Sequence, residues 1–111
     1  MTKDERPQAG EAPSIEQAAL DRDDIFDEIN DERHRQDEKF GDQVNNSLGL
    51  WNAILGEEAG EVQKEVYALL AGAETGKDCG GNVAELRKEL VQTAAVAVAF
   101  IEYGDRNGWW V

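Results

Sequence analysis

The sequence predicts an all-α fold: a helical bundle of three main helices per chain, with a four-helix-type core completed by oligomerisation. Apolar residues recur at helical spacing in three long stretches, and nowhere do they alternate with polar residues as in a half-buried strand. A capping residue precedes each stretch. Three helices of this length bury too little apolar surface for a comfortable bundle, so a homodimer or homotetramer is expected.

Local start and stop patterns divide the chain into a tail and one domain. Residues 1–13 hold both prolines and few apolar side chains, which predicts a disordered N-terminal tail before a single domain over residues 14–111. Ser14 and Asn82 open capping-box patterns, and Ser47, or the asparagine before it, can cap the helix between them. The expected helices cover 14–40, 47–70 and 82–103, and a glycine-rich connection covers 71–81.

The composition excludes several classes of function. The 24 Asp and Glu residues against 11 Lys and Arg residues give a formal charge of -13, which repels phosphate polymers, so no nucleic-acid polymer is expected as a partner. A nucleotide remains a possible ligand where cations neutralise its site. The single cysteine, Cys79, cannot form an internal disulfide, and no apolar run has the length of a membrane helix. We therefore expect a cytoplasmic protein that does not associate with a membrane.

Carboxylates occupy positions in the second helix where core residues are expected. Glu58 follows Trp51 by one heptad and falls inside the apolar arc of that helix. Glu65 lies close beside it, and Glu61 lies at the edge of the arc. Burying an uncompensated carboxylate is costly, so a cation or a hydrogen-bond network is expected at this place.

The predicted buried face of the first helix changes from apolar to polar along the helix. Its buried stripe is predicted to begin with Ala18, Ile25 and Ile29. The continuation of that stripe is polar and consists of Glu32, Arg33 and Gln36. The C-terminal half of this helix is therefore expected to present polar groups towards the interior.

The third helix has two apolar faces, as expected for a helix buried on most sides. One face consists of Leu86, Leu90, Ala94, Ala97 and Ile101, and the other of Val96, Phe100 and Tyr103. Glu89 and Gln92 lie near the second face. All three helices thus offer polar groups to what could be one shared pocket.

Two short motifs carry the chemistry. Glu58-Ala-Gly-Glu61 and Glu89-Leu-Val-Gln92 each place two oxygen donors three residues apart on a helical face, and such donors suit Mg²⁺ or Mn²⁺. The segments ERHRQDEKFGDQ, ILGEEAGEV and ELVQTAAVAVAFIE resemble the MazG-like family of the all-α nucleoside triphosphate pyrophosphohydrolase superfamily. The family pattern is E-x-x-E, a spacer, then E-x-x-D, so Gln92 departs from it at the last position.

This resemblance implies a hydrolase that acts on a phosphoric anhydride: a metal-dependent nucleoside or deoxynucleoside triphosphate pyrophosphohydrolase that releases pyrophosphate and the nucleoside monophosphate. Mg²⁺ is the expected cofactor, with Mn²⁺ as a substitute. The residues expected to hold the metal are Glu58, Glu61, Glu89 and Gln92. Glu58, Glu61 or Glu57 would orient or deprotonate the attacking water.

Substrate contacts are less well specified by the sequence. Lys39 and Arg33 are candidates for phosphate contacts, although ordinary pairing with neighbouring acids explains them equally well. Gln36 or Asn52 could read the edge of a base. Trp51 could stack on the base, but its mostly aliphatic neighbours favour a place in the core.

Other interpretations stay open. The departure at Gln92 could make the chain a catalytically weak nucleotide-binding regulator of the same fold. The acid pairs could instead tune solubility in a non-enzymatic acidic helical interaction protein, which predicts no metal or nucleotide dependence of stability. A di-iron carboxylate bundle is disfavoured, because such sites use Glu-x-x-His pairs and the only histidine, His34, lies outside both acid pairs. The paired Trp109 and Trp110 are expected to pack at an oligomer interface.

Overall fold

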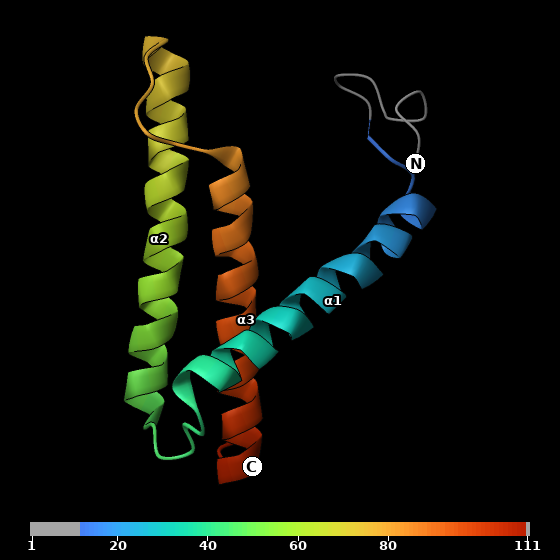
Figure 1. The fold of residues 1–111 in the computed structure, drawn as a ribbon, viewed down its shortest axis with the longest axis vertical. Helices are drawn as coiled ribbons and strands as arrows, with labels where there is room; N and C mark the ends of the chain where they lie inside the picture. The colour runs from blue at the N-terminus through green and yellow to red at the C-terminus, as the bar shows by residue number, and fades with distance from the viewer. Residues whose placement is uncertain (1–11, 111) are drawn as a thin grey trace.

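The computed structural model describes residues 12–110, which form three α-helices joined by two loops (Figure 1). Helix α1 covers Ile15–Phe40, α2 covers Leu48–Thr75 and α3 covers Val83–Asn107. No strand occurs within residues 12–110, so the predicted all-α fold is confirmed. Of the predicted N-terminal tail, residues 1–11 lie outside the described part of the chain.

Side-chain caps set the starts of the helices. The hydroxyl oxygens of Ser14 and Ser47 each accept a hydrogen bond of 3.1 Å from the backbone N–H three residues further on. Asn82 Oδ1 accepts two such bonds at the start of α3. These contacts satisfy N–H groups that have no partner inside the helix, which is why all three starts could be predicted from the sequence.

Two helices run further than expected. Helix α2 continues to Thr75 and α3 continues to Asn107, each about a turn beyond the predicted end. Gly72 and Gly104 lie inside these helices, since a single interior glycine costs only about 1 kcal/mol and does not end a well-packed helix. The helices end instead at Gly76 and Gly108, each with a φ of 69° that favours glycine.

The hairpin of α2 and α3 forms the body of the molecule, and α1 crosses α3 obliquely (Figure 1). The C-terminal half of α1 approaches α3, whereas its N-terminal half diverges from the hairpin. Helices α1 and α2 lie on different flanks of α3 without a close backbone approach to each other.

An aromatic core lies where the α1–α2 loop meets the C-terminal half of α3. Trp51 is 2% exposed and stacks on Tyr103 with ring centroids 5.2 Å apart. Phe100 lies 6.0 Å from Trp51 by the same measure, and Trp109 packs edge-on against Phe100. The second predicted face of α3 is thus buried, and the core interpretation of Trp51 is confirmed.

The predicted buried stripe of α1 is wrong in its N-terminal part. Ala18 is exposed and Ile25 is 42% exposed, because this half of the helix diverges from the hairpin and Ile25 borders only a shallow pocket against α3. The polar continuation of the stripe does face inwards: Arg33 is 6% and Gln36 is 8% exposed. The N-terminal half of α1 is exposed and its C-terminal half is partly buried because α1 crosses α3 obliquely and packs on it mainly through the C-terminal half.

The other predicted face of α3 is also largely open to solvent. Leu90 and Ile101 are 50% and 56% exposed, although both belong to the apolar row expected in the core. At the end of this helix the indole N–H of Trp110 donates a hydrogen bond of 3.3 Å to the carbonyl of Ile101. Trp109 and Trp110 thus cap the aromatic core, and Trp110 remains 52% exposed.

Candidate functional site

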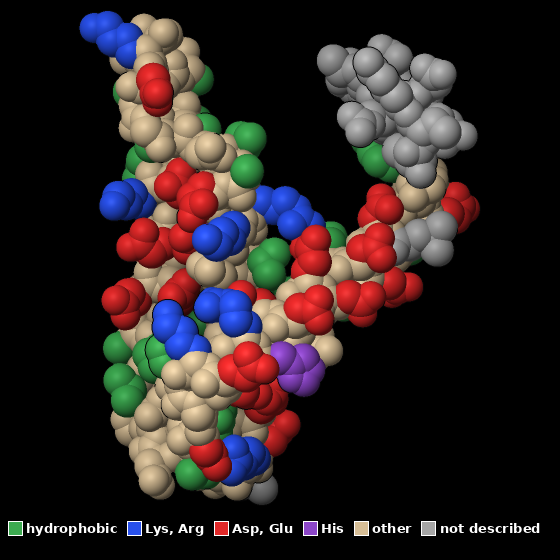
Figure 2. All heavy atoms as spheres, viewed as in Figure 1, with side chains coloured by type: hydrophobic (Ala, Val, Ile, Leu, Met, Phe, Trp, Pro, Cys, Tyr) green, Lys and Arg blue, Asp and Glu red, His purple; other side chains and the backbone are tan. Residues whose placement is uncertain are grey.

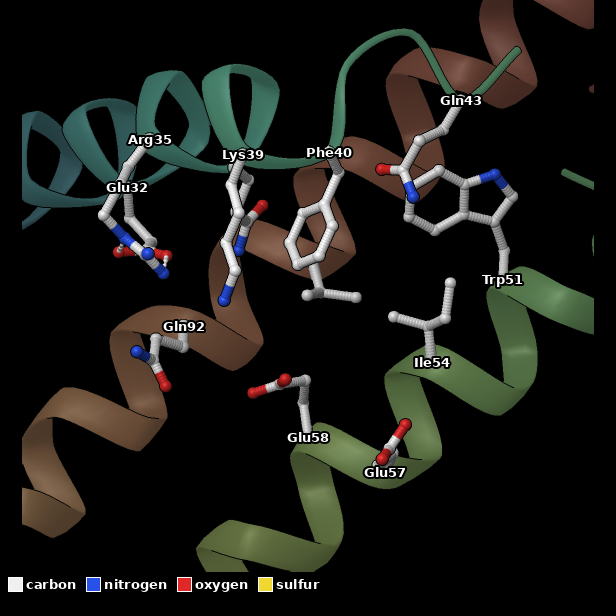
Figure 3. Close-up of a pocket in the computed structure, with 12 residues that line it drawn as sticks. Glu32, Arg35, Lys39, Phe40, Gln43, Trp51, Ile54, Glu57, Glu58 and Gln92 are labelled. Atoms are coloured by element: carbon white, nitrogen blue, oxygen red, sulfur yellow. Dashed lines mark hydrogen bonds and ion pairs between the residues drawn. The ribbon is translucent and has the colours of Figure 1, made fainter. Parts of the chain in front are cut away.

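A cavity of about 410 Å³ lies between α1 and α2, with α3 behind it (Figure 3). Its volume falls in the range of about 300–1,000 Å³ that is typical of small-molecule sites. Its apolar lining consists of Phe40, Trp51, Ile54 and Val96. Its polar lining consists of Glu32, Arg35, Gln36, Lys39, Gln43, Glu57, Glu58 and Gln92. Every helix contributes to the site.

Helical spacing explains how the residues of α1 reach the cavity. Glu32, Gln36 and Lys39 follow one another at intervals of about one turn, so they share the face that α1 turns towards α2. On α2, Ile54 and Glu58 share a face for the same reason. Because α1 does not pack directly on α2, these side chains face each other across open space.

An acidic side of the cavity is formed by α2. In Figure 3 the Glu58 carboxylate points into the space between the helices, in the direction of Gln92. Burial raises the pKa of Glu58, and the negative charges of Glu57, Glu61 and Glu32 raise it further. A positive charge in the cavity would therefore be stabilised by this side.

The negative charges of α2 also affect a carboxyl group on α3, that of Glu89. Burial raises the pKa of Glu89, and the negative charge of Glu58 is the next largest cause. Glu61 adds to this effect. The acids expected to act together thus influence one another electrostatically, as carboxylates facing across a narrow gap do.

A cationic side of the cavity is formed by α1. The Arg35 guanidinium donates two hydrogen bonds to the Glu32 carboxylate, of 2.8 and 2.6 Å. The hydrogen bond from Arg35 is the main cause that lowers the pKa of Glu32. Lys39 extends into the cavity in Figure 3, and no carboxylate of residues 12–110 lies within ion-pair distance of it. Figure 2 shows Lys and Arg side chains interrupting the acidic surface near the crossing of α1 with the hairpin.

The predicted site residues divide into two groups. The cavity brings together six of them: Gln36, Lys39, Trp51, Glu57, Glu58 and Gln92. Glu61, Glu89 and Asn52 do not line it, and Glu61 and Asn52 are exposed on α2. Asn52 turns to solvent because it directly follows Trp51, whose side chain enters the core.

Arg33 lies outside the cavity, contrary to the expectation that it contacts phosphate. Its guanidinium donates hydrogen bonds of 3.1 Å to each carboxylate oxygen of Glu102 and one of 2.9 Å to Asp37. A further bond of 3.3 Å reaches Gln36 Oε1. The two bonds to Glu102 fasten α1 to α3, and those to Asp37 and Gln36 hold the guanidinium in place within α1, so Arg33 has a structural role.

The structure also adds residues that were not singled out from the sequence. Arg35, Phe40 and Gln43 line the cavity, and all three lie in the segment ERHRQDEKFGDQ without having been assigned a role. Arg35 follows Glu32 by three residues and precedes Lys39 by four, which is the spacing of neighbours on one helical face. That spacing was visible in the sequence, but only the crossing of α1 over α3 decides which face meets the cavity.

The donor chemistry of the acids suits a divalent cation, but their present positions do not yet form a ligand cage. Among residues 12–110, no three Asp, Glu, His or Cys side chains come close enough together to hold a metal ion as they stand. Glu58 and Glu89 supply the hard oxygen ligands that Mg²⁺ prefers, and each has a raised pKa that a cation would reverse.

Comparison with known family models, curated proteins and solved structures finds no match. None of the helices in the described part of the chain is long and apolar enough to cross a membrane. The cavity and the motifs of α2 and α3 are therefore the features from which a function can be inferred.

Proposed function

We propose that the chain is a metal-dependent nucleoside or deoxynucleoside triphosphate pyrophosphohydrolase. The observation that carries the proposal is the distribution of charge across the cavity: Glu57 and Glu58 lie on α2, whereas α1 contributes Lys39 without a carboxylate partner among the described residues and Arg35 paired with Glu32. A triphosphate bound together with a divalent cation needs both kinds of neighbour. The resemblance of the E-x-x-E segment to MazG-like proteins supplies the class of reaction.

The resemblance supplies the proposed roles of the acidic side chains. Glu58, Glu61 and Glu89 would hold Mg²⁺ or Mn²⁺, with Gln92 assisting through its amide oxygen. The bound metal would neutralise phosphate charge and lower the pKa of water. Lys39 would contact the phosphates directly, because it has no carboxylate partner among the described residues.

The remaining walls suit the nucleoside. Phe40 and Ile54 form an apolar surface against which a base can pack, and Gln43 lines the same cavity. Gln36 and Gln43 each carry a donor and an acceptor that can read the edge of a base.

The proposed reaction is a hydrolysis at the α-phosphorus. The oxygen of water forms a bond to that phosphorus, the bond to the bridging oxygen breaks, and pyrophosphate leaves. Glu58 would accept the proton of the water, since a raised pKa improves a carboxylate as a general base near neutral pH. Glu57 is the second acid on this wall and the alternative acceptor.

Pyrophosphate release from a panel of NTPs and dNTPs tests the proposal, with Mg²⁺, Mn²⁺ or EDTA present. We expect metal-dependent release, and a loss of about 100-fold or more in kcat/KM for Glu58→Gln. Glu74→Gln is the matched control, because it makes the same change on an exposed site of α2 away from the cavity. Wild-type protein that releases no pyrophosphate from any nucleotide with either metal would contradict an enzymatic role.

A second candidate, a nucleotide-binding regulator, is favoured by one observation: Gln92 lines the cavity where the family pattern has Asp. Under this alternative, nucleotides with Mg²⁺ would raise the melting temperature without turnover, by the usual linkage between binding and stability. Gln92→Asp would then be expected to introduce or increase pyrophosphate release. An increase with Gln92→Asp but not with Gln63→Asp, an exposed position on α2, would assign the difference to this site.

A further inference from the structure

A second cavity adjoins the candidate site, between α1 and α3. It has a volume of about 530 Å³ and shares Glu32, Arg35 and Gln92 with the cavity described above, so the two spaces meet at these side chains. Beyond them it is lined by residues of the N-terminal half of α3, among them Arg87 and Lys88. We call it the α1–α3 cavity.

The α1–α3 cavity gathers cations in a chain that has few of them. Arg35, Arg87 and Lys88 line it, and Lys39 enters the first cavity about one turn of α1 after Arg35. Figure 2 shows Lys and Arg side chains close together where α1 meets the hairpin, on a surface that is otherwise rich in acids. Because the whole chain carries a formal charge of -13, an anion can bind only where such a group of cations outweighs the repulsion.

Three carboxylates line the same cavity, those of Glu28, Asp31 and Glu32. Arg87 pairs with Glu28 at 2.7 Å and Arg35 pairs with Glu32 at 2.6 Å, but the two arginine side chains are 59% and 52% exposed. Ion pairs that water reaches in this way contribute little to stability, so a phosphate group can replace the carboxylate on either guanidinium. Lys88 has no carboxylate of residues 12–110 within ion-pair distance. The cations of this cavity are therefore available to a ligand.

The order of side chains along the first cavity gives a bound nucleotide a direction. Figure 3 shows Phe40 and Trp51 towards one end and Arg35 and Gln92 towards the other, with Glu58 between them. A base that packs at the apolar end directs its phosphates towards the end that adjoins the α1–α3 cavity. The amide of Gln92 lines both cavities and adds no negative charge where the phosphates would pass.

We propose that the α1–α3 cavity binds pyrophosphate, both as the terminal two phosphates of a bound triphosphate and as the group that leaves. Arg35, Arg87 and Lys88 would contact its oxygens, and the planar guanidinium groups of the two arginines suit phosphate. Three cations on two helices match an anion with two phosphate groups better than a single phosphate. The direction of the nucleotide rests on the proposed function, whereas the binding of free pyrophosphate is independent of catalysis.

Isothermal titration calorimetry with inorganic pyrophosphate tests the site, in buffer with EDTA so that only side chains hold the anion. We expect the wild-type chain to bind, and Arg87→Met and Lys88→Met each to bind about 10-fold more weakly, because each loses a charge-assisted contact. Both residues are exposed, so neither substitution removes a core side chain. Lys64→Met is the matched control, since Lys64 is exposed on α2 and lines neither cavity. A wild-type chain that does not bind pyrophosphate, or two cavity variants that bind it as tightly as the control, would overturn the proposal.

Competition in the same buffer, where metal-dependent hydrolysis is blocked, locates the bound pyrophosphate relative to the nucleotide. A nucleoside monophosphate would occupy only the first cavity, so a saturating amount should leave the affinity for pyrophosphate unchanged. The corresponding triphosphate would fill both cavities and should compete. Competition by the monophosphate, or none by the triphosphate, would contradict the assignment of pyrophosphate to the α1–α3 cavity.

The same variants separate this site from the proposed activity when they are also assayed for pyrophosphate release. Binding of pyrophosphate that depends on Arg87 and Lys88, in a chain that hydrolyses no nucleotide, would support the site and contradict the enzyme. Metal-dependent hydrolysis by a chain whose affinity for pyrophosphate is unchanged in both variants would overturn the site alone.

Discussion

The two ends of the molecule differ in how firmly they are built. At the crossing end, the aromatic core of Trp51 and Tyr103 lies beneath the α1–α2 loop. At the open end, no described side chain of α1 before Arg33 is buried. The same three helices therefore enclose a core at one end and leave apolar surface uncovered at the other. Helix formation alone does not make a core; the angle at which helices cross decides where one forms.

The two loops show the same contrast. The loop between α1 and α2 is fastened to α3, with the backbone N–H of Gln43 donating to the Tyr103 hydroxyl at 3.0 Å and Asp42 pairing with Arg106 at 3.0 Å. The loop between α2 and α3 is held mostly by local hydrogen bonds, such as those from Lys77 N–H to Thr75 and from Gly80 N–H to Asp78, and one bond of 3.2 Å joins Asn82 N–H to the more distant Glu65. The candidate site lies beside the better fastened end, which suits a site that must hold its side chains in place.

The largest expected effect is at the crossing end. Trp51→Ala should reduce the free energy of unfolding by about 3–5 kcal/mol, because it removes a fully buried side chain from the aromatic core. At the open end, Leu70→Ala should cost less than about 1 kcal/mol, since Leu70 is 57% exposed. Urea denaturation followed by circular dichroism measures both. Equal losses would show that the two ends do not differ as described.

The second largest loss of stability is expected from a substitution of Arg33, which joins α1 to α3 between the two ends. Arg33→Met removes the hydrogen bonds to Glu102 and Asp37 while keeping an apolar stem, and should cost about 2 kcal/mol. Arg22→Met is the control, because Arg22 is exposed in the N-terminal half of α1. Hydrogen exchange should show faster exchange in α1 of the Arg33 variant alone. An Arg33→Met protein as stable as wild type would show that the contact of Arg33 with Glu102 does not stabilise the packing of α1 on α3.

Two glycines lie close to other atoms, Gly81 to the backbone of α2 and Gly104 to a side chain that can move. A Cβ at Gly81 would lie 2.6 Å from the backbone nitrogen of Leu69, so Gly81→Ala should cost about 1–3 kcal/mol. A Cβ at Gly104 would overlap the ring of Trp110, which is half-exposed and can move aside, so Gly104→Ala should cost about 1 kcal/mol or less. Thermal unfolding ranks the two variants. The reverse order would mean that the Trp110 cap holds the crossing end more tightly than the loop contact holds the open end.

The smallest expected effect concerns charge in the cavity. Because the folded state raises the pKa of Glu58, it binds a proton more tightly than the unfolded chain, so stability falls as the pH rises above the ordinary carboxyl pKa of about 4.3. Glu58→Gln should therefore be slightly more stable than wild type in metal-free buffer at neutral pH, and the difference should vanish in acid. Urea midpoints at several pH values measure this. A Glu58→Gln protein that is less stable than wild type at neutral pH would contradict the assigned repulsion.

Several features followed from the sequence for clear physical reasons. Capping residues satisfy backbone groups within one turn, so Ser14, Ser47 and Asn82 fixed the starts of the helices without reference to the rest of the chain. The heptad relation between Trp51 and Glu58 placed both on one face of α2, and both line the cavity. These are local or single-helix properties, which helical geometry determines.

The sequence could not assign each apolar or charged face to a neighbour. Ile25 and Leu90 have the pattern of core residues and are open, while Arg33 has the pattern of a ligand contact and is a clamp between helices. Periodicity states that a face is apolar or polar, but not what lies opposite. For the same reason the sequence did not show that Arg35 lines the cavity and that Asn52 does not.

By itself, then, the sequence determined three capped helices, their apolar and polar faces, and the acid pairs of α2 and α3. Only the tertiary structure decided that α1 crosses α3 at its C-terminal half, and that crossing created the cavity between Lys39 and Glu58 and left Leu90 and Ile101 exposed. The physical reason is range: capping and periodicity act within a few residues, whereas a crossing angle depends on how side chains far apart in the sequence fit together.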